Sequence, residues 1–100
     1  MNPDGIKIAW DPLKNDKNIK RHHVTFEEAK SVFYDERAKL IDDPDHSDSE
    51  DRFLLLGMSA KFRILLVCHC YRQDDEEIRI ISARKAIGPE ITNYIGDKHA

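Results

Sequence analysis

The sequence has little of what marks several common classes of protein. Its 100 residues include only 4 glycines, 4 prolines and 2 cysteines. So few glycines and prolines, together with 40% hydrophobic residues, argue against a low-complexity or disordered chain. The cysteines, Cys68 and Cys70, lie two positions apart in an apolar run, and no second pair exists. We interpret them as reduced core thiols, in preference to a disulfide framework or a metal or redox pair.

Long apolar segments are also missing. No run approaches the ~18 residues that cross a membrane, and the first residues, "MNPDGIKIAW", lack the basic and apolar regions of a signal peptide. We therefore expect a cytoplasmic protein with no membrane partner. A chain of 100 residues can bury one core but not two, so we predict a single domain over 1–100.

Charge is abundant and unevenly placed. Charged residues make up 35% of the chain, with a net charge of −3. Residues 13–23, "LKNDKNIKRHH", are mainly basic, whereas residues 35–51 are mainly acidic. The overall balance argues weakly against a nucleic-acid partner, but the basic segment leaves room for a local anion site.

Local signals predict where the helices begin. Asp11 before Pro12 is typical of a helix start, and Thr25 with Glu28 forms a capping box. His23, between the two helices, stands where a helix end favours glycine, so we predict a left-handed conformation there. The complete prediction is strand 5–10, helix 12–22, helix 26–34, strands 38–42, 50–57, 61–71 and 79–86, and helix 88–97.

That order, β-α-α-β-β-β-β-α, favours an α+β fold. We predict a single antiparallel sheet with two N-terminal helices and one C-terminal helix, packed mainly on one face. If the turn at residues 57–60, "GMSA", has an even-length loop, one face carries Glu50, Arg52, His69, Ser82 and Arg84. The other face then forms the core, with Phe53, Leu55, Phe62, Ile64, Leu66, Cys68, Cys70, Ile81 and Ala83. An odd loop or a bulge would change the assignment, because a slip of one residue turns every side chain over.

The charged face is suited to binding and cleaving a phosphodiester. Arginine binds phosphate oxygens in a bidentate manner and stabilises the charge that develops in transfer. Histidine or glutamate can move protons near neutral pH, and attack by an RNA 2′-hydroxyl needs no metal. The candidate catalytic residues are therefore Glu50, Arg52, His69 and Arg84. The candidate RNA-binding residues are Lys14, Lys17, Arg21, His22, Arg79 and Ser82.

Structural interpretations of the same residues stay open. Glu50 and Arg52 could form a surface ion pair, and His69 could be a half-buried core residue. Arg84 could brace the last helix, and Arg79 could pair with the acids of "DDEE", residues 74–77. We predict no cofactor, because no ligand completes a zinc site with the histidines, and the acidic run 42–51 is more typical of a solvated loop.

Several unrelated short blocks occur in one order along the chain: "WDP", "FEEA", "DRF" and "RIISAR". With their surroundings, roughly residues 6–94, they make the sequence resemble the BrnT toxins of bacterial type II toxin–antitoxin systems. In the family pattern a glycine follows the histidine that matches His22, and His23 replaces it here. Positions that match family blocks and carry useful chemistry include Trp10, Asp11, Lys14, Asn18, His22, Glu50, Arg52, His69, Arg79, Ser82 and Arg84.

The resemblance implies a small ribonuclease with a RelE-like fold and RNA as its substrate. It also implies inhibition by a BrnA-type antitoxin, with operator DNA bound only through that partner. Exposed apolar residues on the helices are candidates for the antitoxin interface: Val32, Phe33, Ile91, Tyr94 and Ile95. The competing hypothesis is a catalytically weak binding or co-repressor subunit. The presence of Glu50, Arg52, His69 and Arg84 favours the enzyme.

Overall fold

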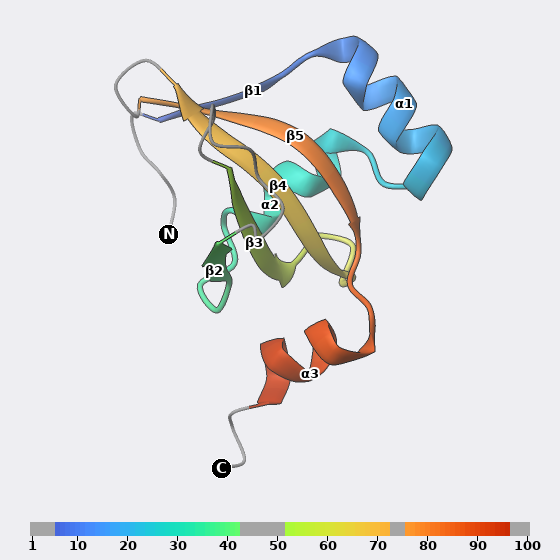
Figure 1. Ribbon diagram of the computed structural model, residues 1–100, viewed down its shortest axis with the longest axis vertical. Helices are drawn as coiled ribbons and strands as arrows, with labels where there is room; N and C mark the ends of the chain where they lie inside the picture. Colours follow the sequence, from blue (N-terminus) through green and yellow to red (C-terminus); the bar gives the residue numbers. More distant parts are fainter. Residues whose placement is uncertain (1–5, 43–51, 73–75, 97–100) are drawn as a thin grey trace.

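The structure, a computed structural model, describes residues 6–42, 52–72 and 76–96 (Figure 1). The order of helices and strands agrees with the prediction from sequence. The elements are β1 (Lys7–Trp10), α1 (Pro12–His22), α2 (Phe26–Val32), β2 (Lys39–Asp42), β3 (Phe53–Met58), β4 (Ile64–Arg72), β5 (Glu77–Lys85) and α3 (Gly88–Gly96). None of these helices is long and apolar enough to cross a membrane.

Both N-terminal helices begin at the caps that the sequence predicts. The Leu13 amide donates to Asp11 Oδ1 at 2.9 Å, and the Glu28 amide donates to Thr25 Oγ1 at 3.0 Å. His23 ends α1 with φ 60°, a left-handed conformation, and its amide donates to the Ile19 carbonyl at 2.9 Å. The prediction for His23 is therefore confirmed.

The sheet has five strands in the order β1-β5-β4-β3-β2. The predicted single antiparallel sheet is wrong in one respect, because β1 pairs in parallel with β5 and makes the sheet mixed. Short turns between sequence neighbours indicate antiparallel pairs, and β3, β4 and β5 follow that rule. The partner of β1 is distant in sequence, so no turn signal reveals its direction.

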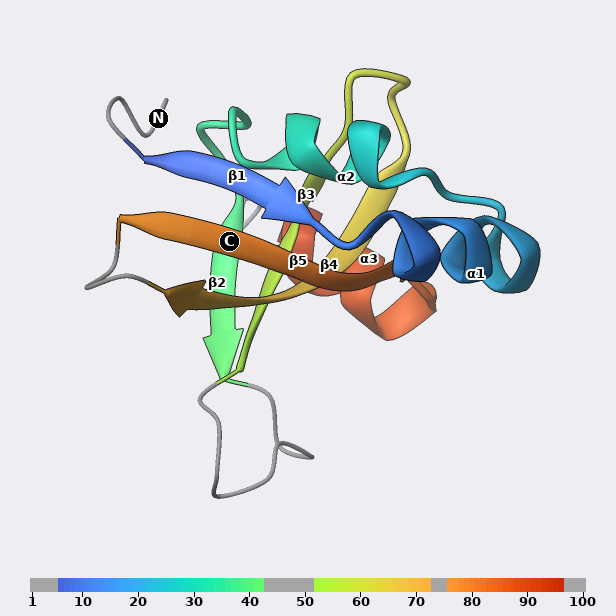
Figure 2. The ribbon, with the colours of Figure 1, turned by 90° about the horizontal axis from the view of Figure 1, so that it is seen from above.

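The helices lie on both sides of this sheet. Figure 2 shows α2 and α3 on opposite sides, so the prediction that helices pack mainly on one face fails for α3. We call the side that packs against α2 the helical face. Its core consists of Val24, Phe26, Ala29, Val32, Leu55, Leu65, Val67, Ile80 and Ala83. Trp10 adds an edge-on contact to Phe26.

Helix α1 closes an edge of the sheet that β1 leaves open. Strand β1 pairs with β5 only as far as Ile80. Beyond it, Asn18 Nδ2 donates to the Ala83 carbonyl at 2.8 Å, and the Ala83 backbone amide donates to Asn18 Oδ1 at 3.0 Å. The buried Asn18 side chain thus takes the place of a neighbouring strand and fixes α1 beside β5.

Helix α3 is attached mainly by polar contacts, and none of its described residues is buried. Lys39 Nζ donates to the Asn93 carbonyl at 2.6 Å, and the Tyr94 hydroxyl donates to Asp35 Oδ2 at 2.6 Å. Partial burial, followed by the Asp35 carboxylate, raises the pKa of Tyr94 to about 12. Tyr94 therefore stays protonated and keeps this bond throughout the physiological pH range.

Two register features decide which side chains share a face. Strands β3 and β4 pair Phe53 with His69 and Met58 with Ile64, so their loop is residues 59–63 and has an odd length. This contradicts the even loop assumed from sequence. In consequence His69 faces the same way as Phe53 and Leu55, on the helical face.

The second feature is a bulge in β5. Cys68 lies opposite Ser82, but the next residue, His69, lies opposite Ile80, so Ile81 is an extra residue. Before the bulge, the Arg79 side chain lies on the same side of the sheet as that of its partner Cys70. After the bulge, Ser82 and Arg84 lie on the same side as their partners Cys68 and Leu66. Arg79, Ser82 and Arg84 therefore share one face, although simple alternation separates Arg79 from the other two. Ile80, and not the predicted Ile81, enters the core.

Candidate functional site

The side of the sheet opposite the helical face carries the polar residues of β5. We call it the arginine face and define it by Arg52, Arg79, Ser82 and Arg84. Arg52 directly precedes Phe53, which is on the helical face, so strand alternation places Arg52 on the arginine face opposite Cys70. Cys68 and Cys70 are buried on the same face and are not joined in a disulfide, as expected of reduced cysteines. The predicted core residues Leu66, Cys68 and Cys70 are thus buried, but on this side of the sheet.

Arg84 is held by a carboxylate of the last helix. Its Nη1 and Nη2 donate to Glu90 Oε1 and Oε2, both at 2.9 Å, and the Ile87 amide also donates to Glu90 Oε1. These bonds lower the pKa of Glu90 and raise that of Arg84. The alternative in which Arg84 braces the last helix is confirmed.

Arg52 and Arg79 differ from Arg84 in having polar atoms without a partner. Arg79 Nη2 donates to Glu77 Oε2 at 3.0 Å, which confirms the predicted pairing with an acid of residues 74–77. The Nε atoms of Arg79 and Arg52 are buried and have no hydrogen-bond partner in the described part of the chain. Buried N–H groups are nearly always satisfied, so these two Nε atoms are unusual among the described residues.

His69 does not join these arginines. Its side chain has 0% exposure and lies against the rings of Phe33, Phe53 and Tyr71, with a Phe33 centroid distance of 4.9 Å. Burial lowers its pKa to about 4, so the imidazole is neutral at pH 7. The prediction that His69 shares a face with Arg52 and Arg84 is wrong, because the odd-length hairpin loop turns His69 to the helical face. A buried ring on that face cannot touch RNA.

The other predicted site residues fall into two groups. Glu50 lies outside the residues that the structure describes. Lys14, Lys17 and Arg21 are exposed along α1, and His22 is half-buried at its C-terminal end. Burial, followed by the positive charges of Arg21, Arg84 and His23, lowers the pKa of His22. The structure therefore brings the end of α1 close to Arg84, which the sequence could not show.

Sequence reasoning missed two residues of interest. Glu77, read as part of a solvated turn, begins β5 and is buried beside Arg79. Phe62, predicted in the core, is 85% exposed with φ 63° at the tip of the β3–β4 hairpin. Its position between Lys61 and Arg63 in a tight turn was the signal that it could point outward.

Metal-ligand side chains do not cluster in the described ranges. Across residues 6–42, 52–72 and 76–96, no three His, Cys, Asp or Glu side chains lie close enough together to hold a metal ion.

The fold and the arginine face define a small α+β protein suited to binding a phosphodiester. Comparison with known proteins agrees. The family model described as "Ribonuclease toxin, BrnT, of type II toxin-antitoxin system" matches residues 10–90. The chain therefore belongs to the BrnT family of ribonuclease toxins.

A solved structure gives the same result. The Brucella abortus ribonuclease toxin BrnT, known from a crystal structure, has 26% sequence identity to this chain, and the two structures match with a TM-score of 0.63. The match covers 83% of this chain and 99% of that one. No curated protein matches the sequence. Membership of a type II toxin–antitoxin family also implies an antitoxin protein as partner.

Proposed function

We propose that this protein is a metal-independent endoribonuclease that uses the arginine face to bind RNA and is neutralised by a BrnA-type antitoxin. Family membership supports ribonuclease activity. The observation that carries the site is the bulge at Ile81, which brings Arg79, Ser82 and Arg84 to one face of the sheet. Bulges next to active sites commonly re-aim side chains in this way.

Arg52 and Arg79 hold the phosphate that is cut. The two residues flank Cys70 on neighbouring strands of the arginine face, and guanidinium groups bind phosphate oxygens in a bidentate manner. The two guanidinium groups stabilise the charge that builds up on the phosphate during transfer. Arg84 keeps a different role, because Glu90 already occupies its planar edge.

Glu77 is our candidate for the proton acceptor. Its carboxylate is bound to Arg79 and sits on the same strand face. In the proposed step Glu77 takes the proton of the RNA 2′-hydroxyl, and the 2′-oxygen attacks phosphorus. The bond from phosphorus to the 5′-oxygen breaks, and water protonates that oxygen. The products are a 2′,3′-cyclic phosphate and a free 5′-hydroxyl. Glu50 stays an alternative base on sequence grounds.

The remaining RNA-binding candidates extend the surface. Ser82 lies between Arg79 and Arg84 on β5, and His22, at the end of α1, is close enough to Arg84 to feel its charge. Phosphates on one side of the cut can contact these residues, and Lys14 and Lys17 continue the basic side of α1.

The residues available for an antitoxin interface differ from those predicted from the sequence. Val32 is fully buried and Phe33 packs against the core, so neither is available to a partner. Ile91 and Ile95 of α3 are exposed, as is Ile87 just before it. We propose that a BrnA-type antitoxin covers these residues, that it binds operator DNA for the complex, and that it blocks the nearby arginine face.

The test is cleavage of a single-stranded RNA by purified protein in excess EDTA. Activity should persist, and Arg79→Ala or Arg52→Ala should lower kcat by ~10²–10³-fold, the usual loss for one donor to the transition state. Arg37→Ala, an exposed arginine outside the arginine face, serves as the matched control and should act like the parent. Activity that disappears in EDTA and returns with Mg²⁺ would overturn the metal-free mechanism. A protein that never cuts RNA but strengthens operator binding would support the co-repressor alternative.

A further inference from the structure

The tip of the β3–β4 hairpin presents a large aromatic side chain to solvent. Phe62 is 85% exposed, and its φ of 63° is in the left-handed region that aromatic residues seldom adopt. Neither feature benefits the folded chain by itself. A non-glycine residue held in this region is a sign of local strain, which commonly accompanies function.

The tip is rigid because side chains hold its backbone. Ser59 Oγ accepts hydrogen bonds from the amides of Lys61 and Arg63 at 3.1 and 3.3 Å, and donates to Glu28 Oε2 at 2.6 Å. The Phe62 amide donates to the Ser59 carbonyl at 2.9 Å. In addition, the Ala60 amide donates to Ser31 Oγ at 2.7 Å. These bonds attach the turn, which carries Phe62, to helix α2.

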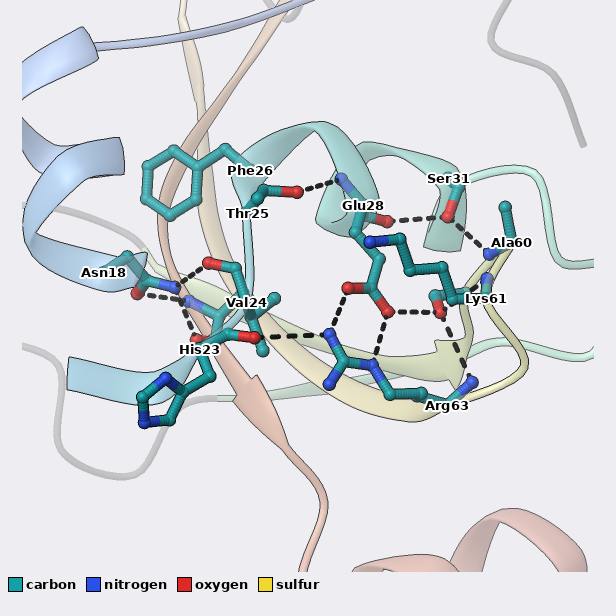
Figure 3. Close-up of polar contacts among 12 residues, drawn as sticks. Asn18, His23, Val24, Thr25, Phe26, Glu28, Ser31, Ala60, Lys61 and Arg63 are labelled. Carbon is teal, nitrogen blue, oxygen red and sulfur yellow. Dashed lines mark hydrogen bonds and ion pairs between the residues drawn. The ribbon is translucent and has the colours of Figure 1, made fainter. Parts of the chain in front are cut away.

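The charge around this tip is positive. Arg63 binds both carboxylate oxygens of Glu28 and also donates to the His23 carbonyl, which removes the negative charge of Glu28 from the surroundings (Figure 3). Lys61 beside Phe62 is exposed. His23 also links the tip to the basic end of α1, where Lys20, Arg21 and His22 form the last turn. An exposed aromatic ring with cations around it matches a negatively charged partner with flat apolar groups.

We propose that Phe62 is a platform on which an unpaired base of the RNA stacks, with Lys61 and the end of α1 contacting the neighbouring phosphates. This inference rests on the proposed ribonuclease function and adds a subsite to it. The Ala86 amide donates to the Ile64 carbonyl at 2.9 Å, so the hairpin tip adjoins the end of β5. Stacking accepts any base, because every base has a π face.

The subsite is distant from the cut. Arg79 pairs with Cys70 and Lys85 with Leu65, so five strand rises of ~3.3 Å separate them, which is about 17 Å. A dinucleotide bound at Arg52 and Arg79 therefore cannot reach Phe62, whereas a longer strand can. Phe62 should affect the binding of long RNA and leave the cleavage of a dinucleotide unchanged.

The experiment compares the parent with Phe62→Ala, Phe62→Leu and Phe62→Trp. On a long single-stranded RNA, the KM of Phe62→Ala should rise about 5- to 100-fold, the loss expected for one stacked base, with kcat nearly constant. Phe62→Leu keeps the apolar surface but not the ring, so its KM should rise almost as much. Phe62→Trp should keep the parent KM. Leu13→Ala, which truncates another exposed apolar residue (68%), is the matched control.

Fluorescence separates this proposal from the ribonuclease mechanism. The indole of Phe62→Trp should be quenched by a long RNA, and the parent, with Trp10 as its sole tryptophan, provides the baseline. Quenching needs no cleavage, so it tests stacking even if the protein proves unable to cut RNA. The proposal is overturned if Phe62→Ala leaves the KM for long RNA unchanged, or if Phe62→Leu behaves like the parent. It is also overturned if Phe62→Ala weakens only antitoxin binding, which would make the ring a protein contact.

Discussion

His69 is surrounded by three aromatic rings, and this environment sets the chemistry of its imidazole. Nδ1 lies 3.3 Å from the Val67 carbonyl, and Nε2 has no hydrogen-bond partner among the described residues. Charging the ring would place a cation against Phe33, Phe53 and Tyr71 without water, so burial lowers its pKa to about 4 from 6.5. The residue is therefore a structural part of the core with a built-in sensitivity to acid.

A pH dependence of stability follows from that shift. The unfolded chain binds the His69 proton below pH ~6.5, whereas the folded chain resists it until about pH 4. The free energy of unfolding should therefore fall as the pH drops through this window, by about 3 kcal/mol from His69, and level off for this group below it. Urea unfolding at several pH values measures the effect. The variant His69→Leu should lose this part of the slope, and an unchanged slope would show that the ring is not buried.

At the scale of elements, the β3–β4 hairpin and helix α2 are joined by one carboxylate. Glu28 accepts from Ser59 and from Arg63, and its side chain is 1% exposed. The Arg63 hydrogen bond keeps the pKa of Glu28 below its usual value, although burial acts in the opposite direction. This carboxylate thus joins the core to the tip that carries Phe62.

Removing that carboxylate should loosen the hairpin. Glu28→Ala leaves the Arg63 guanidinium and the Ser59 hydroxyl without their partner, so we expect unfolding to become easier by about 2–3 kcal/mol. Glu27→Ala, one position earlier and exposed, should change stability by less than ~0.5 kcal/mol. Chemical denaturation of both variants gives the comparison. The double variant Glu28→Ala with Arg63→Ala should be less destabilised than the sum of its parts, and strict additivity would contradict a direct link.

The elements also show which features the sequence could predict. The helix starts at Asp11 and Thr25 and the left-handed His23 depend on a few neighbouring residues, and these predictions are confirmed. The odd hairpin loop and the bulge at Ile81 depend on how strands pair across the sheet. Local signals do not fix such pairings, so one residue of slip moved His69 to the wrong face. The parallel pairing of β1 with β5 likewise depends on residues that are far apart in sequence.

The sequence indicated which types of residue make up the candidate site but not how they are arranged. Arg52, Ser82 and Arg84 share a face as expected, but the bulge adds Arg79, and the fold brings His22 toward Arg84. The burial of Glu77 and the exposure of Phe62 were missed because both depend on contacts with β4 and α2 that lie far away in sequence. Residue type indicated phosphate chemistry, whereas tertiary pairing determined which groups can act together.

The whole molecule has a net charge of −3, yet its proposed substrate is a polyanion. Long-range attraction is therefore weak, and RNA binding must come from local contacts on the arginine face and the basic end of α1. Each cation that neutralises a phosphate releases counterions, which makes affinity fall with salt. For single strands, each such contact contributes about −0.7 to the slope of log K against log salt concentration.

The change in this slope on mutating one residue therefore measures how many phosphate contacts that residue makes. Binding of a fluorescent, non-cleavable RNA (its 2′-hydroxyls replaced) is measured by anisotropy over a range of salt concentrations. Arg79→Ala should make the slope shallower by about 0.7, because one guanidinium–phosphate contact is lost. Phe62→Ala should weaken binding at every salt concentration with the slope unchanged, because stacking releases no counterions. Arg37→Ala should change neither quantity. If Arg79→Ala lowers affinity without changing the slope, Arg79 shapes the site through Glu77 and does not touch a phosphate.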